Sequence, residues 1–427
     1  MKSSDLSDPV MNPTDYNVAD WILALYGDDF ICIDKGFYIY HNGKWLHDFK
    51  MALTQNVINK HLREYFKKQL SKISHETDPE KYKSVTSTAR KFETLTKIKS
   101  TMEALITKLY ARCDKIEFDS NAQLIAFENC AYDFIKEEFR PIRKDDYLTM
   151  STGYDYVEST ATQYLQVKSI VESIFPNVEI RESYRSILYQ ACIGDCPQKF
   201  VIANGNGRNG KGVLTGMVMT TLGVGVNGYS YKGPSAILQS KQKIGANPEI
   251  ASMHNKRLVI FTEPTEEIPI QQAPMKEYSG GGSVCARQLY SNITLCTLVA
   301  MIIMECNAKP NMNGSDMESE CILGRLMDIE FASTFTDAPE RLLLPNHFPQ
   351  DERFSTKLFQ QEHASALFKY IIGTEHTKIY NPECVKQRTR EYTRQSDEIF
   401  QFMSENYEPS DCESDYVKSK MYIKTLR

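Results

Sequence analysis

Short apolar runs alternate with helical patterns through the second half of the chain. The four runs, each bounded by polar, Gly or Pro residues, are Phe200–Ala203, Arg257–Thr262, Leu298–Met304 and Leu326–Phe331. Continuous apolar segments of this length are typical of strands that are buried on both faces of a sheet. Because helical segments separate them, the pattern predicts an α/β domain with a central, mainly parallel sheet.

The hydrophobic pattern before residue 157 is of another kind. Helical spacing runs through Lys60–Lys81 and Thr86–Leu109, with an interruption at Pro79. Short strand-like stretches separated by turn residues lie around them: Phe37–Tyr40, Leu124–Phe134, Phe139–Ile142 and Gly153–Tyr156. We expect a loose segment over residues 1–15 and a smaller mixed α+β domain over residues 16–157. The basic residues of the helical segments are more typical of a solvated face than of a DNA contact.

Helical patterns flank the predicted sheet. Residues 160–195 have the pattern of two helices broken at Pro176, and the chain from Arg353 onward is helical in pattern. The chain stops within such a pattern at Tyr422–Arg427, so we expect an incomplete C-terminal region. The predicted domains are therefore residues 158–345, which hold the sheet, and residues 346–427, which are helical.

Composition limits the kinds of partner. The 427 residues carry a formal net charge of −5, so a nucleic-acid site would have to be local, such as a groove or the pore of a ring. No apolar run is long enough to span a bilayer, and the N-terminus lacks a signal-peptide core. We expect an intracellular protein without membrane contact. The 11 cysteines lack the paired clusters of a zinc site, which favours free thiols.

The strongest chemical signal is a glycine-rich loop between the first apolar run and a helical segment. It has the form G-x-x-x-x-G-K, and its candidate phosphate-binding residues are Gly205, Asn206, Gly207, Arg208, Asn209, Gly210, Lys211 and Gly212. Glycines let backbone N–H groups approach phosphate, and Lys211 can reach the β and γ oxygens. Gly212 stands where a Ser or Thr hydroxyl normally coordinates Mg²⁺. The alternative is a Gly-rich hairpin without a ligand.

Polar residues follow or begin the other apolar runs. Glu263 comes after the second run and is a candidate acid that holds Mg²⁺ directly or through water, although Thr262 occupies a place where an Asp often precedes it. Asn307 follows the third run and could position water or touch a γ-phosphate. Arg325 begins the fourth and could act on a neighbouring subunit. Taken singly, each has an ordinary explanation: a lone acid, a turn residue and a surface ion pair.

A segment with three consecutive glycines lies between the acid and the asparagine. Lys276, Arg287 and Tyr290 flank the glycines, and cationic groups with an aromatic ring suit the backbone and bases of single-stranded DNA. Three glycines break a helix and open a loop or a hairpin. A plain connector explains the composition equally well.

The order and spacing of these elements resemble superfamily 3 helicases, in particular the poxvirus-type primase–helicase ATPases of large DNA viruses, phages and mobile elements. The matching segments are Gly205–Lys211, Arg257–Pro264, Lys276–Gly281 with Ala286–Arg287 and Leu289–Tyr290, Asn307–Pro310, and Arg325–Leu326 with Phe331. Residues of the first domain resemble the family's helicase-associated N-terminal domain, namely Ala126–Asn129, Tyr132–Asp133 and Thr152–Tyr156. The resemblance implies an AAA+-like P-loop ATPase fold after that domain.

The resemblance also implies a role for each matched residue. Lys211 corresponds to the phosphate-loop lysine, Glu263 to the acid that activates water, Asn307 to the sensor asparagine and Arg325 to the inter-subunit arginine finger. Lys276, Arg287 and Tyr290 fall in the segment associated with DNA. Family members use ATP and Mg²⁺, form rings that are typically hexameric, and translocate on single-stranded DNA to unwind forked duplex.

The implied partners are a primase or polymerase of the replication machinery, at a viral replication site in the host cytoplasm or nucleus. The sequence holds no candidate primase domain, so priming is expected from another polypeptide or from a missing N-terminal region. Four residues depart from the family pattern, namely Gly212, Gly282, Gly324 and Cys130.

The sequence therefore predicts an ATP-dependent DNA helicase of viral or mobile-element replication. Gly212 and Thr262 leave open a catalytically weak nucleotide-binding ring or loader. A small-molecule kinase fits the phosphate loop and the length, but it leaves Asn307 and Arg325 without roles.

Overall fold

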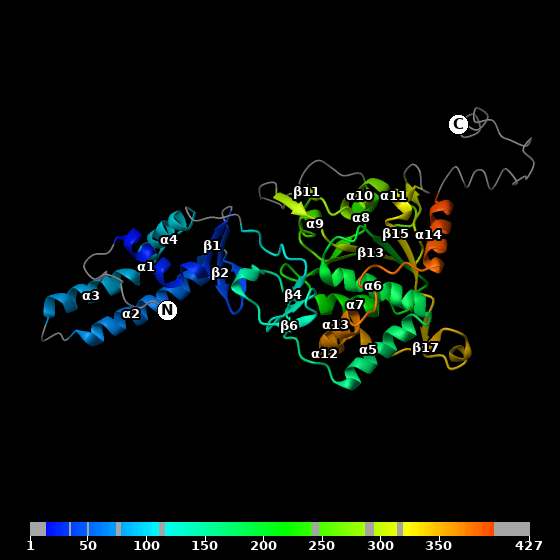
Figure 1. The fold of residues 1–427 in the computed structure, drawn as a ribbon, viewed down its shortest axis with the longest axis horizontal. Coiled ribbons are helices and arrows are strands. Elements are labelled where there is room, and N and C mark those ends of the chain that lie inside the picture. Colours follow the sequence, from blue (N-terminus) through cyan, green and yellow to red (C-terminus); the bar gives the residue numbers. More distant parts are fainter. Residues whose placement is uncertain are drawn as a thin grey trace, which may run out of the picture. The chain divides into compact units, whose positions relative to one another are not determined.

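The computed structural model describes residues 14–33, 36–48, 51–73, 78–110, 116–240, 247–286, 294–313 and 319–396. The chain divides into two units, Met1–Asp155 and Tyr156–Arg427, each of which makes most of its contacts internally (Figure 1). This division lies close to the boundary near residue 157 that the strand pattern predicts. The limits of the functional domains themselves stay a prediction.

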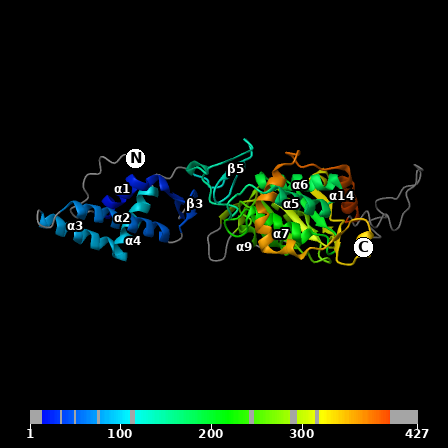
Figure 2. The same cartoon turned by 90° about the horizontal axis from the view of Figure 1, so that it is seen from below.

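The first unit begins with helices packed on a small antiparallel sheet. The helices are α1 (Asp15–Tyr26), α2 (Ala52–Lys72), α3 (Pro79–Phe92) and α4 (Leu95–Tyr110), and the strands are β1 (Phe30–Ile33), β2 (Gly36–His41) and β3 (Lys44–His47) (Figure 2). Thr14 caps α1 through a reciprocal pair of hydrogen bonds with Asn17. The core of this part includes Trp21, Phe92 and Leu105. The helical run expected over Thr86–Leu109 is therefore two helices, which separate after Phe92.

The rest of the first unit is a three-stranded antiparallel sheet of β4 (Leu124–Ala126), β5 (Ala131–Asp133) and β6 (Glu138–Arg140). A half-buried ion pair follows β6: Arg140 Nη1 and Nη2 each lie 2.8 Å from a carboxylate oxygen of Asp146. The Trp45 backbone N–H of β3 donates to the Leu148 carbonyl at 2.9 Å, which ties the first sheet to the segment after β6. Gly153–Tyr156 is not a strand, contrary to the sequence pattern.

The second unit contains a five-stranded parallel sheet with the strand order β15-β7-β13-β9-β8. The strands are β7 (Phe200–Asn204), β8 (Ser230–Pro234), β9 (Leu258–Thr262), β13 (Met301–Cys306) and β15 (Leu326–Glu330). The four predicted apolar runs are four of these strands, and the predicted α/β fold with a central parallel sheet is confirmed. β8 lacks a continuous apolar run because it is an edge strand that contains Lys232, Gly233 and Pro234.

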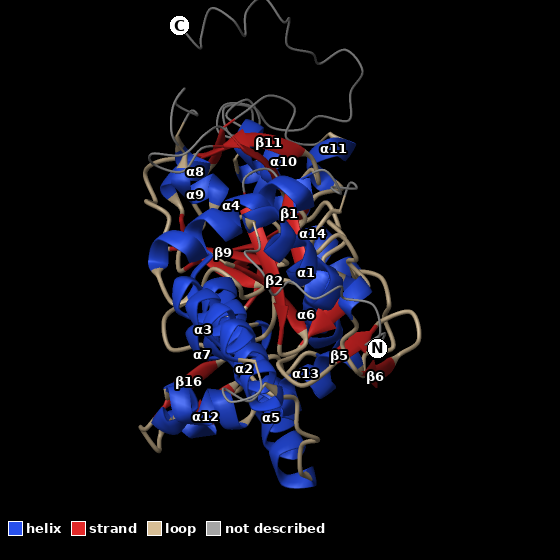
Figure 3. Cartoon of the chain, turned by 90° about the vertical axis from the view of Figure 1, so that its left-hand side faces the viewer, coloured by secondary structure: helices blue, strands red, loops and turns tan. Residues whose placement is uncertain are grey.

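Helices cover both faces of this sheet (Figure 3). One face carries α5 (Ala161–Ile174), α6 (Val178–Ile193), α7 (Lys211–Leu222), α12 (Lys357–Glu362) and α13 (Ala364–Ile372). The other packs on α8 (Ala236–Gln239), α9 (Pro248–Ala251), α10 (Gln272–Tyr278), α11 (Glu320–Leu323) and α14 (Glu383–Gln395). The break predicted at Pro176 separates α5 from α6. The part of the predicted C-terminal helical region after Ser396, including Tyr422–Arg427, lies outside the described residues.

Short strand pairs surround the main sheet. They are β10 (Ile270–Gln271) with β14 (Met312–Asn313), β11 (Ser283–Ala286) with β12 (Thr294–Thr297), and β16 (Thr334–Thr336) with β17 (His347–Pro349). The glycine-rich segment thus opens an antiparallel hairpin. Short 3₁₀ turns lie at Gly27–Asp29, Lys144–Asp146, Arg341–Leu343 and Glu352–Ser355. Across the described ranges, no helix has both the length and the apolar character to cross a bilayer.

Candidate functional site

The glycine-rich loop joins the end of β7 to the start of α7. Gly205 and Gly210 have φ angles of +148° and +82°, and a Cβ at Gly205 would lie 2.5 Å from the Phe331 carbonyl oxygen. A Cβ at Gly210 would lie 2.7 Å from the side chain of Ile174. Both positions therefore require glycine. The Phe335 N–H donates to the Arg208 carbonyl at 2.7 Å and ties the loop to the segment after β15.

Lys211 lies in the first turn of α7 and turns back over the loop. Its Nζ donates to the Gly205 carbonyl at 2.5 Å and to Asn307 Oδ1 at 3.3 Å. The residue is buried, and burial lowers the pKa of its ammonium group. The structure thus brings together two of the predicted site residues, the loop lysine and the asparagine that follows β13.

Glu263 lies directly after β9, but β9 is not the neighbour of the loop strand, because β13 lies between β7 and β9. The residue has a left-handed backbone with φ of +54°, and its N–H donates to the Glu305 carbonyl at 3.1 Å. Its side chain is exposed. Glu263 is therefore at the same edge of the sheet as the loop, one strand away.

Glu305 is a carboxylate in this region to which the sequence analysis gave no role. It is buried on β13, and Thr215 of α7 donates a hydrogen bond to its Oε1. Burial raises the pKa of this carboxyl, while the charges of Lys232 and Lys211 act in the opposite direction. An acidic residue inside an otherwise apolar strand, two positions before Asn307 and so on the same strand face, is the signal that could have identified it.

Arg325 precedes β15 and lies at the amino ends of the strands, whereas the loop follows the carboxyl end of β7. Its carbonyl accepts from the Phe200 N–H at 2.8 Å, at the start of β7. Five strand residues at a rise of about 3.3 Å put the beginning of β7 roughly 16 Å from the loop at its end. Arg325 therefore does not lie beside the phosphate loop of its own chain.

The predicted DNA-contacting residues fall only partly within the described ranges. Lys276 lies half-buried on α10, with its Nζ 3.4 Å from Gln272 Oε1. Arg287 and Tyr290 lie outside the described residues.

A cavity of about 870 Å³ adjoins the loop. Its apolar lining includes Ile170 and Ile174 of α5, Val213 of α7, and the aromatic rings of Phe335 and Phe348. Arg208 and Gly210 of the loop also line it. Its size is in the range of small-molecule sites, and the mixture of apolar walls with a few polar groups is typical of them. The sequence gave no sign of it, because its lining comes from four separate segments.

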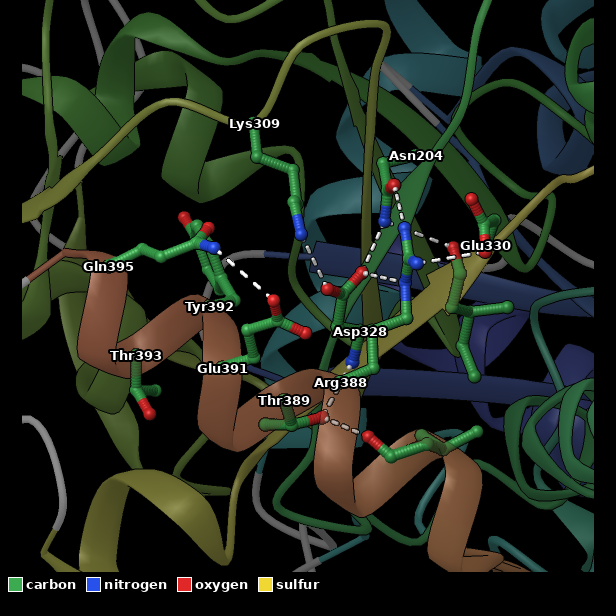
Figure 4. A network of polar contacts seen from close by, with 12 residues as sticks. Asn204, Lys309, Asp328, Glu330, Arg388, Thr389, Glu391, Tyr392, Thr393 and Gln395 are labelled. Atoms are coloured by element: carbon green, nitrogen blue, oxygen red, sulfur yellow. Dashed lines mark hydrogen bonds and ion pairs between the residues drawn. The ribbon is translucent and has the colours of Figure 1, made fainter.

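A polar network lies behind the loop, on the other face of the sheet (Figure 4). The buried Asp328 accepts from Lys309 Nζ at 2.7 Å and from Asn204, the residue before Gly205. From α14, Arg388 donates to Asn204 Oδ1 at 2.9 Å and to Glu330 Oε2 at 2.8 Å. The network therefore joins α14 to the end of the loop strand and to the segment that follows Asn307.

The described residues contain no cluster of three or more His, Cys, Asp or Glu side chains that would hold a metal ion by themselves. Among the described residues, the oxygen donors at this edge of the sheet include the carboxylates of Glu263 and Glu305 and the hydroxyls of Thr215 and Thr262. This set fits Mg²⁺, which typically binds one or two carboxylates and completes its octahedron with phosphate oxygens and water. It does not fit a thiolate or imidazole metal site.

A glycine loop between a parallel strand and a helix, with lysine in the first helical turn and asparagine after the adjacent strand, defines a P-loop nucleotide-binding fold. Residues 19–187 match the family described as D5 N terminal like. The chain is 28% identical over 298 residues to "Putative helicase L207/L206" of Acanthamoeba polyphaga mimivirus, covering 66% of this chain and 30% of that protein. It is 26% identical over 276 residues to Primase D5 of fowlpox virus, covering 61% and 34%. The chain is thus similar, over residues 19–187, to the family described as D5 N terminal like, and over about two thirds of its length to viral proteins named helicase or primase.

A solved structure shares the fold. The apo C-terminal region (305-718) of NrS-1 superposes with a TM-score of 0.52 at 12% identity, over 94% of this chain and 78% of that one. The chain spans only about a third of the length of its viral relatives, 30% of the mimivirus protein and 34% of the fowlpox protein. The activities of these longer viral proteins are therefore only proposed for this chain.

Proposed function

We propose that the chain is the motor part of an ATP-dependent DNA helicase of viral or mobile-element replication. The observation that carries this proposal is the contact between Lys211 and Asn307 above a loop whose two glycines, Gly205 and Gly210, cannot be replaced without collision. This arrangement suits a lysine that contacts β and γ oxygens while an amide on the next strand senses the γ-phosphate. Relatives named helicase and primase support a role in DNA replication.

The nucleotide has room beside the loop. Phosphates would lie against the backbone N–H groups of residues 205–212, and the base and ribose in the cavity lined by Ile170, Ile174 and Phe335. ATP would bind with Mg²⁺, and Glu263 would act on the attacking water from the end of β9, which β13 separates from the loop strand. Each site would receive Arg325 from the next subunit of a ring, expected to be a hexamer. Lys276, Arg287 and Tyr290 would contact single-stranded or forked DNA within it, and a primase or polymerase would be the partner.

The test is a Mg²⁺-dependent ATPase assay, with and without single-stranded DNA, on protein fractionated by size. We expect turnover in the oligomeric fraction, stimulation by DNA, and loss of turnover in Lys211→Ala. Lys168→Ala, which removes an exposed lysine of α5, is the control and should behave as wild type. ATPase that is neither stimulated by DNA nor reduced by Lys211→Ala would overturn the proposal.

The second candidate is a nucleotide-binding ring or loader that turns over little ATP. Two residues favour it. Gly212 offers the cation no hydroxyl directly after the lysine, and Thr262 offers no carboxylate before Glu263. A loader would bind ATP and assemble without hydrolysis, so the same assay, combined with nucleotide binding, separates the two functions.

A further inference from the structure

The residues that normally hold the divalent cation of a P-loop site are altered in this chain. Gly212 has no side chain, and a Cβ built there would meet nothing within 4 Å, so the space of the usual hydroxyl is open. Thr262, the last residue of β9, supplies a hydroxyl in place of a carboxylate. A carboxylate from elsewhere in the site could take over this task, and Glu305 has the position for it.

Glu305 lies on the central strand between the phosphate-loop strand and β9. Its register partners are Ala203 on one side and Thr262 on the other, so its side chain shares their face of the sheet, the face covered by α7. Only 8% of the residue is exposed. Its carboxyl contacts Thr215, one helical turn after Lys211, so the group lies against the start of α7.

One oxygen of this carboxylate is fixed and the other is available. Thr215, one helical turn after Lys211, donates to Oε1. Within the described part of the chain, no hydrogen bond reaches Oε2, and that oxygen is not among the fully enclosed atoms that lack a partner. A buried carboxylate held by one hydroxyl, with a second oxygen that accepts no hydrogen bond among the described residues, is the arrangement of an oriented metal ligand.

We propose that Glu305, oriented by the Thr215 hydroxyl, is the carboxylate that binds the divalent cation accompanying the nucleotide. This inference rests on the proposed function, because the cation needs phosphate oxygens as its other ligands. A hard divalent cation prefers carboxylate oxygen, and its positive charge would offset the cost of an anion buried at this position. Glu305 replaces the contact that Gly212 cannot make.

The test measures metal affinity separately from turnover. Binding of Mn²⁺ is followed by electron paramagnetic resonance on the full chain saturated with a non-hydrolysable ATP analogue, for wild type, Glu305→Gln, Thr215→Val and Glu263→Gln. Loss of a ligand or of its orienting partner typically weakens metal binding by about 10- to 100-fold. We expect a loss of this size in Glu305→Gln and a smaller one in Thr215→Val. Affinity for the analogue in EDTA should stay at the wild-type value in both variants.

Gly212→Ser provides the complementary test, since the space at this position admits a hydroxyl. In the Glu305→Gln background it should recover part of the Mn²⁺ affinity. Wild-type Mn²⁺ affinity in Glu305→Gln, or an equal loss of analogue binding in EDTA, would overturn the inference while leaving the proposed function intact. Wild-type protein that binds no nucleotide would overturn both. If Glu305→Gln does not fold, Thr215→Val with normal Mn²⁺ affinity is the overturning result.

Discussion

Gly205 and Gly207 stand in the same loop yet meet different constraints. At Gly205, φ is +148° and an added Cβ would lie 2.5 Å from the Phe331 carbonyl oxygen, whereas at Gly207 a Cβ would meet nothing within 4 Å. We expect Gly205→Ala to displace the loop and weaken nucleotide binding by tenfold or more, since about 1.4 kcal/mol is enough for that. Gly207→Ala is the matched control and should bind normally. Titration with a fluorescent ATP analogue measures both, and equal effects of the two substitutions would contradict this account.

The ion pair between Arg140 and Asp146 makes acid stability testable in the first unit. Burial alone would raise the pKa of Asp146, but hydrogen bonds from Arg140 and from the Arg143 N–H hold it below its ordinary value. A carboxyl with a lowered folded-state pKa stabilises the fold above its unfolded value of about 3.9 and loses this contribution as pH falls through the folded value.

Asp146→Asn should therefore cost about 1.5 kcal/mol of unfolding free energy at neutral pH, the typical contribution of a hydrogen bond to a charged group. The difference from wild type should shrink as pH falls below about 3.9 and vanish once pH lies below the lowered folded-state pKa of Asp146. Urea unfolding at pH 7 and at pH 3 measures this change. A difference from wild type that is the same at both pH values would show that the charge of Asp146 is not its cause.

The sequence located some site residues and missed others for a physical reason. Lys211 and Asn307 come shortly after the carboxyl ends of β7 and β13. Parallel strands bring their carboxyl ends to one edge of a sheet, so the positions of the apolar runs in the sequence predict that these two residues lie close together. The interaction of Glu305 with Thr215 depends on which face of β13 meets α7. That choice is made by tertiary packing, which a single sequence does not display.

At the scale of elements, the Arg388 side chain joins α14 to the end of the loop strand. Arg388 contacts Asn204, Glu330 and the buried Asp328, whereas Arg390 of the same helix forms an exposed ion pair with Glu383. Without Arg388, Asp328 keeps Lys309 and Asn204 but loses a charged neighbour. We expect Arg388→Ala to cost about 2 kcal/mol of stability and to weaken nucleotide binding through Asn204.

Arg390→Ala is the matched control, since an exposed ion pair contributes about 1 kcal/mol or less. Thermal unfolding with and without an ATP analogue measures both variants. If the analogue raises the melting temperature of Arg388→Ala as much as that of wild type, then α14 is structural and does not influence the loop.

The secondary-structure elements were predictable where burial of apolar side chains determines the sequence pattern. The strands of the parallel sheet are buried on both faces, so β7, β9, β13 and β15 appear as apolar runs. β8 was missed because its residues Lys232 and Pro234 are exposed, so it shows no continuous apolar run. Gly153–Tyr156 has the composition of a strand, but it pairs with no strand among the described residues. The Tyr154 carbonyl accepts instead from the Glu128 N–H at 3.0 Å, outside β4, so the local β propensity of the tyrosines does not produce a strand.

At the scale of the whole molecule, the position of Arg325 bears on assembly. It lies at the start of β15, while the phosphate loop lies at the opposite edge of the same sheet, roughly 16 Å away by strand rise. An arginine side chain does not span that distance, so any action of Arg325 on nucleotide has to occur in another subunit. Its contacts within the chain are weak, with Nη1 3.5 Å from Gln198 Oε1 and no hydrogen bond from Nε among the described residues.

A mixing experiment tests the shared site. Arg325→Ala should bind the ATP analogue as wild type but lose turnover, and Lys211→Ala should lose turnover as well. When the two proteins are mixed, subunit exchange creates interfaces that pair the intact loop of one with the intact arginine of the other, and only these interfaces can hydrolyse ATP. We therefore expect ATPase activity to return in the mixture, and to return only at concentrations at which oligomers form. Arg341→Ala, which removes an exposed arginine, should retain full activity alone. A mixture as inactive as either variant, in oligomers shown to exchange subunits, would exclude Arg325 from the neighbouring site.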